Sequence, residues 1–161
     1  MEIKQLAQKV NDALRAKGVT LSTAESCTGG GIAAAITSIP GSSEIFKGGI
    51  VAYSNEVKQS VLSVSEKTLQ DYGAVSEATV QQMAAGVARL MQTECAIATS
   101  GIAGPGGGTA EKPVGTVWLA LSINGETHTR LLNLADKGRE ANIEATIQTA
   151  LETLHRLLSD N

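Results

Sequence analysis

Ser26 and Cys27 are adjacent residues whose side chains can both act as nucleophiles, and they stand just before three consecutive glycines at positions 29–31. A glycine-rich helix start brings bare backbone N–H groups to a positive helix terminus, which stabilises anions and developing oxyanions. The segment from Thr23 to Gly31 can therefore hold a nucleophile and the N–H donors of Thr28–Gly31 in one loop. The alternative is a turn whose glycines serve backbone geometry alone, and chemistry alone does not choose between the two nucleophiles.

A serine nucleophile needs a base, and the sequence offers few. The two histidines, His128 and His155, have no partners at the spacing of a metal site, so we interpret both as structural or surface residues and expect neither a histidine-based triad nor a zinc site. A desolvated lysine can take a serine proton. Lys58 follows Tyr53 by five residues, and these two are the candidates for base and helper. Their alternatives are a solvated surface lysine and a tyrosine used for packing.

The hydrophobic spacing predicts the elements that must position these residues. Helices are expected at residues 3–14, at 32–39, after Ser54 or Asn55, after Ser65, after Ser76 and at 139–158; strands are expected at 19–22, 48–53, 95–99, 116–123 and 127–134, the last two joined by an Asn124-Gly125 turn. This order predicts a three-layer α/β/α single domain with a mixed sheet that includes a C-terminal antiparallel hairpin. Segments 23–31, 53–58 and 100–108 each follow a strand, so we expect them at one rim of the sheet.

Composition bounds the class of protein. The 161 residues are 42% hydrophobic and 18% charged, which is typical of a globular chain, and the four aromatic residues imply an aliphatic, alanine-rich core. A net charge of −3 argues against a nucleic-acid partner. Because no 18-residue apolar run and no basic-then-apolar leader occurs, we expect no membrane partner and a cytoplasmic location. Two cysteines do not make a disulfide framework.

Six motifs occur together in this chain. They are Thr23-Ala24-Glu25-Ser26-Cys27-Thr28-Gly29-Gly30, Pro40-Gly41-Ser42-Ser43, Tyr53-Ser54-Asn55-x-x-Lys58, Gly73-Ala74-Val75-Ser76, Ser100-Gly101-Ile102-Ala103-Gly104-Pro105 and Lys112-Pro113-Val114-Gly115-Thr116-Val117. In that order, from about residue 5 to residue 155, the sequence strongly resembles the CinA C-terminal domain family, the nicotinamide-mononucleotide (NMN) amidohydrolases. The resemblance implies hydrolysis of the NMN carboxamide to nicotinate mononucleotide and ammonia, in bacterial pyridine-nucleotide salvage.

The resemblance also assigns residues. The nucleophile falls on Ser26, the base on Lys58 and its helper on Tyr53, without a cofactor or metal. Substrate contacts are expected from Glu25, Thr28, Gly29, Gly30, Ser42, Ser43, Ser100, Gly101, Gly104 and Arg139. The donors available for the NMN phosphate are the second glycine-rich loop, the two serines at 42 and 43, and the arginine at 139. Position 100 is Ser where many relatives have Thr, which keeps the hydroxyl.

Larger family members carry an additional N-terminal domain, whereas we expect residues 1–161 to form one domain. The resemblance further implies a homo-oligomer, a dimer or a higher assembly. Two alternatives to NMN hydrolysis stay open at this point. One is a catalytically inactive pyridine-nucleotide-binding or regulatory module of the same fold, and the other is an amidase that acts on a different carboxamide.

Overall fold

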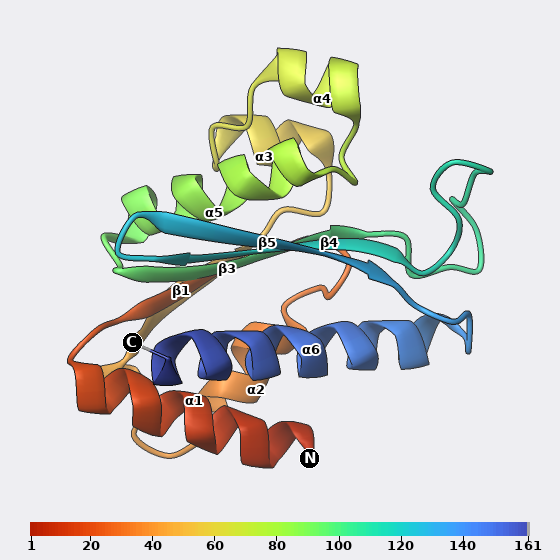
Figure 1. The fold of residues 1–161 in the computed structure, drawn as a ribbon. Coiled ribbons are helices and arrows are strands. Elements are labelled where there is room, and N and C mark those ends of the chain that lie inside the picture. The colour runs from red at the N-terminus through yellow and green to blue at the C-terminus, as the bar shows by residue number, and fades with distance from the viewer. Residues whose placement is uncertain (161) are drawn as a thin grey trace.

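The computed structural model describes residues 1–160, which form three layers. In chain order the elements are α1 (Ile3–Lys17), β1 (Leu21–Glu25), α2 (Gly31–Thr37), the short 3-10 helix η1 (Ser42–Glu44), β2 (Phe46–Val51), α3 (Asn55–Ser60), α4 (Glu66–Tyr72), α5 (Glu77–Met91), β3 (Cys95–Gly101), β4 (Thr116–Ile123), β5 (Glu126–Asn133) and α6 (Arg139–Ser159). Helices α1, α2 and α6 cover one face of the sheet, and α3, α4 and α5 lie over the other (Figure 1). The predicted α/β/α architecture is confirmed.

The sheet is mixed, with the strand order β2-β1-β3-β4-β5. β1 pairs in parallel with β2 and β3, whereas β4 runs antiparallel to both β3 and β5. The carboxyl ends of the three parallel strands therefore share one edge. From β1 the chain passes to β2 on one side and then returns to β3 on the other. In doubly wound sheets, this reversal opens the crevice in which ligands bind.

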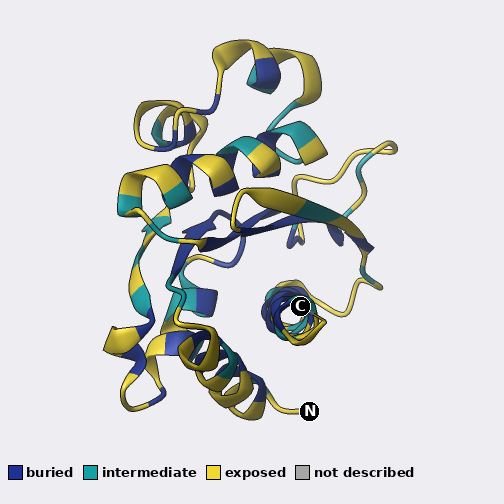
Figure 2. Cartoon of the chain, turned by 60° about the vertical axis from the view of Figure 1, so that its left-hand side comes forward, coloured by how far each residue is buried: buried dark blue, intermediate teal, exposed yellow. Residues whose placement is uncertain are grey.

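Two hydrophobic cores flank the sheet, and Figure 2 shows the buried residues concentrated in the strands and on the helix faces turned toward them. The core beside α1, α2 and α6 is aliphatic and includes Leu14, Leu21, Ile32, Ile36, Ile97, Leu119, Leu151 and Leu154. On the α5 side the strands contribute alanines instead, namely Ala24, Ala96, Ala98 and Ala120. Small side chains let α5 pack close to the sheet, as the scarcity of aromatic residues leads one to expect.

Serine caps set where three successive helices begin. Ser54, Ser65 and Ser76 each accept a hydrogen bond from the backbone N–H three residues later, at 3.1 to 3.2 Å. The helix starts predicted after residues 65 and 76 are confirmed, and Ser54 rather than Asn55 caps α3. As a consequence, Lys58 lies about one turn into α3.

Several boundaries at the carboxyl edge differ from the predictions. The strand expected at 19–22 is Leu21–Glu25, the one expected at 48–53 is Phe46–Val51, and the one expected at 95–99 continues to Gly101. β1 is enclosed by two neighbouring strands and all five of its residues are buried. Pairing on both sides thus overrides the weak strand preference of Ala24 and Glu25. α2 likewise ends at residue 37 rather than 39.

The C-terminal hairpin follows its sequence signal closely. Asn124 and Gly125 have φ angles of 50° and 85°, the left-handed backbone that a two-residue type I′ turn requires. The turn joins β4 to β5 in register, with Ile123 opposite Glu126.

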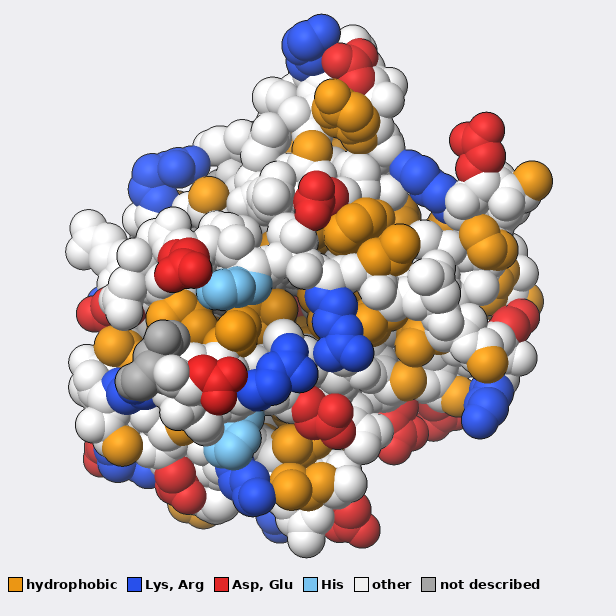
Figure 3. Space-filling view, viewed as in Figure 1, with side chains coloured by type: hydrophobic (Ala, Val, Ile, Leu, Met, Phe, Trp, Pro, Cys, Tyr) orange, Lys and Arg blue, Asp and Glu red, His pale blue; other side chains and the backbone are white. Residues whose placement is uncertain are grey.

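On the face shown in Figure 3, basic and acidic side chains are interspersed rather than gathered by sign. Within residues 1–160, no helix combines the length and apolar character needed to cross a membrane.

Candidate active site

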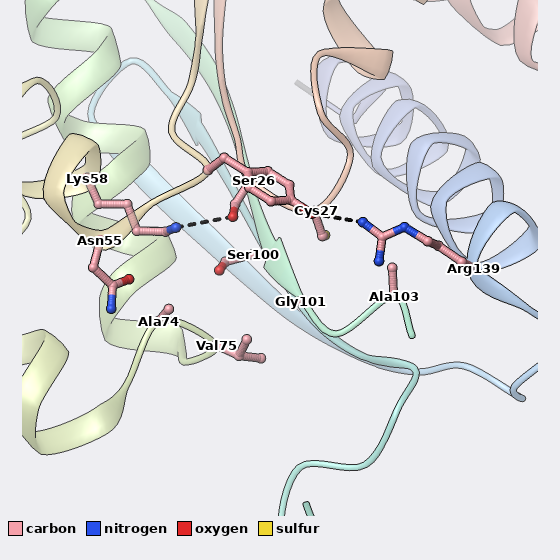
Figure 4. Close-up of a pocket in the computed structure, with 11 residues that line it drawn as sticks. Ser26, Cys27, Asn55, Lys58, Ala74, Val75, Ser100, Gly101, Ala103 and Arg139 are labelled. Carbon is pink, nitrogen blue, oxygen red and sulfur yellow. Dashed lines mark hydrogen bonds between the residues drawn. The ribbon is translucent and has the colours of Figure 1, made fainter. Parts of the chain in front are cut away.

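A hollow of about 230 Å³ lies at the carboxyl ends of the parallel strands. Its lining comes from the loops after β1, β2 and β3, from the start of α3, from the segment before α5 and from the start of α6. The lining residues are Ser26, Cys27, Tyr53, Asn55, Lys58, Ala74, Val75, Ser100, Gly101, Ala103 and Arg139 (Figure 4). Residues far apart in the chain therefore meet at the β1–β3 switch point, where such sheets bind ligands.

Ser26 and Lys58 are in direct contact at the base of this hollow. Lys58 Nζ lies 3.1 Å from Ser26 Oγ and donates a hydrogen bond of 2.9 Å to the carbonyl oxygen of Ala52. The lysine is only 1% exposed, and no ion pair with a carboxylate is formed by it within residues 1–160. Burial lowers the pKa of Lys58 from its ordinary value of 10.5. A lysine whose neutral form is favoured can accept the proton of a neighbouring serine.

Cys27 also borders the hollow, but its chemistry differs from that of its neighbour. Burial, and to a smaller degree the nearby Glu25 carboxylate, raises the pKa of the Cys27 thiol to about 11. The thiolate is the nucleophilic form of cysteine, and this environment disfavours it. Lys58 thus contacts the Ser26 hydroxyl, whereas the surroundings of Cys27 favour its protonated thiol.

Tyr53 and Arg139 form a polar cluster at the rim of the hollow. Arg139 Nη2 donates to Tyr53 Oη at 2.8 Å, and Nη1 donates to the carbonyl oxygen of Gly104 at 2.7 Å. The tyrosine is 60% exposed, and its hydroxyl bonds the guanidinium rather than Lys58. Tyr53 therefore holds the arginine over the pocket, together with the Gly104 carbonyl.

The first turn of α2 is closed by Glu25 from within the chain. The Glu25 carboxylate, on a residue 1% exposed, accepts hydrogen bonds from Ile32 N at 2.8 Å, Ala33 N at 3.0 Å and Thr28 Oγ1 at 2.6 Å. A buried anion thus occupies the positive terminus that the sequence offered to a ligand.

The glycine N–H groups of this turn are also partly used. Gly29 N donates to Ser26 O at 3.0 Å, and Gly31 N donates to Thr28 O at 2.9 Å. Gly30 has a φ of 96°, a left-handed conformation that favours glycine. These residues shape the turn that presents Ser26, and they lie outside the lining of the hollow together with Glu25 and Thr28.

The predicted contacts divide between the two edges of the sheet. Ser100 and Gly101, at the end of β3, line the hollow with Ser26. Ser42 and Ser43 lie in η1, just before β2 and next to the start of β1, where Leu21 N donates to Ile45 O at 2.7 Å. Because β1 and β2 are parallel, η1 sits at the amino ends of the strands, opposite the hollow. The structure therefore separates these two serines from the pocket of their own chain.

The observation that decides the family is the match over almost the whole chain. The sequence profile described as the CinA C-terminal domain matches residues 3–158. The chain belongs to the CinA C-terminal domain family. A CinA-like protein of Parasynechococcus marenigrum is 49% identical over 154 residues, which cover 95% of this chain and 37% of that protein. The chain thus spans little more than a third of such relatives.

A second relative is close to this chain in length. The nicotinamide-nucleotide amidohydrolase PncC of Escherichia coli K12 is 52% identical over 130 residues, covering 80% of this chain and 79% of that protein.

Solved structures from the CinA family share the fold. The competence/damage inducible protein CihA of Agrobacterium tumefaciens is 44% identical with a TM-score of 0.94, covering 99% of this chain and 96% of that chain. The CinA superfamily protein KP700603 of Klebsiella pneumoniae is 38% identical with a TM-score of 0.96, and the match covers 100% of both chains.

Sequence reasoning assigned no role to four residues that line this CinA pocket, namely Asn55, Ala74, Val75 and Ala103. A signal for them existed, since each lies inside one of the motifs shared with the family. The sequence analysis placed only segments that follow a strand at the rim, whereas the segment around Ala74 precedes a helix. The described residues contain no group of three or more His, Cys, Asp or Glu side chains arranged to hold a metal ion.

Proposed function

We propose that this protein hydrolyses the carboxamide of NMN to nicotinate mononucleotide and ammonia, with Ser26 as nucleophile and Lys58 as base. The observation that carries the proposal is the buried Lys58 amine, 3.1 Å from Ser26 Oγ and without a carboxylate partner among the described residues. The similarity to the nicotinamide-nucleotide amidohydrolase of Escherichia coli supports the choice of substrate.

The reaction begins with attack on the carboxamide carbon. Neutral Lys58 takes the Ser26 Oγ proton while Oγ bonds to the carbon and the carbonyl π electrons move onto oxygen. When this intermediate collapses, the C–N bond breaks and the Lys58 ammonium returns a proton to the departing nitrogen, which leaves as ammonia. The nicotinoyl ester on Ser26 remains.

Hydrolysis of the Ser26 ester by water completes the cycle, and Lys58 again accepts and returns the proton. Lys58, neutral again, takes a proton from a water molecule as its oxygen attacks the ester carbon. The ester C–O bond then breaks, Ser26 Oγ regains a proton from Lys58, and nicotinate mononucleotide is released. One water is consumed and one ammonia is formed for each turnover, so the balance needs no redox partner.

The size and charge of the hollow favour one orientation of NMN. At about 230 Å³, it is smaller than the roughly 300–1,000 Å³ of pockets that enclose drug-sized ligands. The pyridine carboxamide fits inside against Ser26, and the ribose phosphate extends to the open rim. Arg139, fixed there by Tyr53 and Gly104, supplies the guanidinium that holds the phosphate. Tyr53 then acts as a positioning residue for Arg139.

Ammonia release from NMN tests the proposal. The wild-type protein is expected to release one ammonia per NMN consumed, at a rate unchanged by chelator, and Ser26→Ala and Lys58→Met are expected to abolish the release. Calorimetric binding of NMN without ammonia from the wild type would instead establish a non-catalytic binding module. A panel of NMN, nicotinamide and NAD separates NMN hydrolysis from an amidase with another carboxamide substrate.

A further inference from the structure

Thr28 is buried two residues after Ser26, yet its side chain does not line the hollow. Its hydroxyl donates a hydrogen bond of 2.6 Å to Glu25 Oε1 and lies 2.9 Å from Thr99 Oγ1. A hydroxyl has one proton to give, and a carboxylate only accepts. Thr28 therefore gives its proton to Glu25 and accepts the proton of Thr99, so both hydrogen bonds of this side chain are made within the protein.

The two partners of Thr28 are fixed in the sheet. Glu25 and Thr99 stand opposite each other in the parallel pairing of β1 with β3, and both are buried. The Glu25 carboxylate is further held by two backbone N–H groups at the start of α2. The Thr28 hydroxyl thus joins the loop after β1 to a rigid part of the fold.

The same loop is also joined to β3 at Ser26. The backbone N–H of Ser26 donates to the carbonyl oxygen of Thr99 at 3.0 Å, which continues the strand pairing one residue beyond β1. Thr99 therefore holds residue 26 with its carbonyl and residue 28 with its hydroxyl. The direction of the Ser26 side chain depends on the backbone on both of its sides, so the two hydrogen bonds together aim Oγ.

Lys58 is held from the neighbouring strand. Its Nζ donates to Ala52 O at 2.9 Å, and Ala52 N donates to Glu25 O at 2.8 Å. The position of the lysine amine is therefore set relative to the backbone of Glu25, and Ser26 is the next residue in the chain. The 3.1 Å separation between Lys58 Nζ and Ser26 Oγ (Figure 4) thus depends on two short series of hydrogen bonds that meet at Glu25.

We propose that Thr28 is a positioning residue for Ser26, whose hydroxyl, held between Glu25 and Thr99, keeps Ser26 Oγ within hydrogen-bond distance of Lys58 Nζ. The inference rests on the proposed function, which makes Ser26 the nucleophile. Thr28 acts through the backbone of the loop and touches neither the substrate nor the reacting atoms. Because a displacement of about 1 Å can cost about 10²-fold in rate, the hydroxyl contributes to turnover rather than to substrate binding.

Thr28→Val tests the proposal, because valine keeps the shape of the side chain and removes the hydroxyl. Glu25 retains its two backbone partners on α2, so that helix stays capped. We expect kcat for NMN to fall by about 10-fold to 10²-fold, with KM and the pH midpoint of kcat/KM unchanged because Lys58 stays buried. Thr28→Ser restores the hydroxyl and should recover most of kcat. Thr99→Val, which removes the other bond of this hydroxyl, should lower kcat in the same way.

Thr153→Val is the matched control. Thr153 is a buried residue of α6 whose hydroxyl also makes two hydrogen bonds, donating to Thr149 O and accepting from Arg130 Nη1. It does not line the hollow, so its replacement should lower stability as that of Thr28 does and leave kcat unchanged. An equal loss of kcat in the Thr28 and Thr153 variants, or no recovery in Thr28→Ser, would overturn the proposal.

Crystal structures of the wild type and of Thr28→Val test the geometry without turnover. In the variant, Ser26 Oγ is expected to lie more than about 3.5 Å from Lys58 Nζ, beyond hydrogen-bond distance, while Lys58 keeps its bond to Ala52 O. An unchanged contact between Ser26 and Lys58 would refute the positioning role. Failure of the wild type to release ammonia from NMN would refute only the proposed function, because the two crystal structures still decide the role of Thr28.

Discussion

Lys58 lies in an environment that is unusual for a lysine. A lysine that is 1% exposed without a counter-charge is costly to keep protonated, and its contacts with Ala52 O and Ser26 Oγ satisfy an amine better than they satisfy a full charge. This cost falls at the position where the proposed mechanism requires a neutral amine. Perturbed groups that cluster in a cleft are characteristic of active sites.

The pH dependence of hydrolysis follows from this burial. In the proposed mechanism Lys58 accepts the Ser26 proton only when the lysine is neutral, so kcat/KM for NMN is expected to rise with pH and to level off once the amine has lost its proton. Because burial lowers the pKa of Lys58 from 10.5, the midpoint should lie below 10.5. Lys58→Arg replaces the amine with a guanidinium that stays protonated, and this variant should be inactive at every pH. A rate that falls as pH rises from about 6 to about 9, below the ordinary lysine pKa of about 10.4, would contradict this role.

Cys27 should be dispensable for hydrolysis despite its place in the pocket. With a pKa of about 11, its thiol is protonated at neutral pH and is a poor nucleophile. Cys27→Ala is expected to keep kcat within about tenfold of wild type, while Ser26→Ala loses it. Iodoacetamide at pH 7.5, applied before an NMN assay, should leave most activity intact. If Cys27→Ala were as inactive as Ser26→Ala, the assignment of the nucleophile would be wrong.

Among the elements, α2 depends on an acid that comes from the strand before it. Glu25 binds two backbone N–H groups and a hydroxyl from a buried position. Glu25→Ala leaves these donors unpaired and is expected to lower the free energy of unfolding by at least about 2 kcal/mol. Denaturant titration measures the loss. Glu44→Ala, which breaks an exposed ion pair with Arg15, should cost less than about 1 kcal/mol. Equal losses in the two variants would argue against the capping role.

Helix α5 depends on a glycine for its close approach to the backbone of Leu62, which follows α3. A Cβ at Gly86 would overlap the Leu62 carbonyl oxygen and lie 2.8 Å from its carbon. Alanine normally stabilises a helix relative to glycine by about 1 kcal/mol. At this position the steric clash with the backbone should outweigh that gain, so Gly86→Ala is expected to lower the free energy of unfolding by about 1–3 kcal/mol. Gly106→Ala meets nothing within 4 Å, so its unfolding free energy should stay within about 0.5 kcal/mol of wild type. A stabilised Gly86→Ala would show that α5 is free to shift.

The order of helices and strands was predictable because hydrophobic spacing, serine caps and the Asn124-Gly125 turn are local signals. The extension of β1 through Glu25 was not, because a buried glutamate in a strand makes sense only once Ile32 and Ala33 offer it their N–H groups. At the site, the pairing of Ser26 with Lys58 could be anticipated from strand ends that share a rim. The capping of α2 by Glu25 could not be anticipated, because it depends on the backbone N–H groups seven and eight residues later in the chain being brought to the carboxylate by the fold.

At the scale of the whole molecule, the pocket exists only in the assembled sheet. Its lining runs from Ser26 to Arg139, and the segments meet because the crossover from β1 to β2 and the crossover from β2 to β3 run in opposite directions along the sheet. The Arg139 guanidinium reaches the rim from the last helix, where it joins Tyr53 after β2 and Gly104 after β3. A ligand in the hollow therefore contacts segments from nearly the full length of the fold, and its binding free energy should add to the stability of all three layers.

NMN is accordingly expected to stabilise the whole fold when turnover is blocked. In Ser26→Ala, NMN at 100 times its Kd should add about 2.7 kcal/mol to the free energy of unfolding, a rise in Tm of about 5–10 °C for a chain of this size. Thermal unfolding followed by circular dichroism measures this rise. Nicotinamide is the control, because it lacks the ribose phosphate that we propose Arg139 to bind, and it should shift Tm less. Adding Arg139→Ala should remove most of the difference between the two ligands. An identical Tm with and without NMN would mean that the pocket does not bind this nucleotide, whereas a shift in wild-type protein that releases no ammonia would identify a binding module.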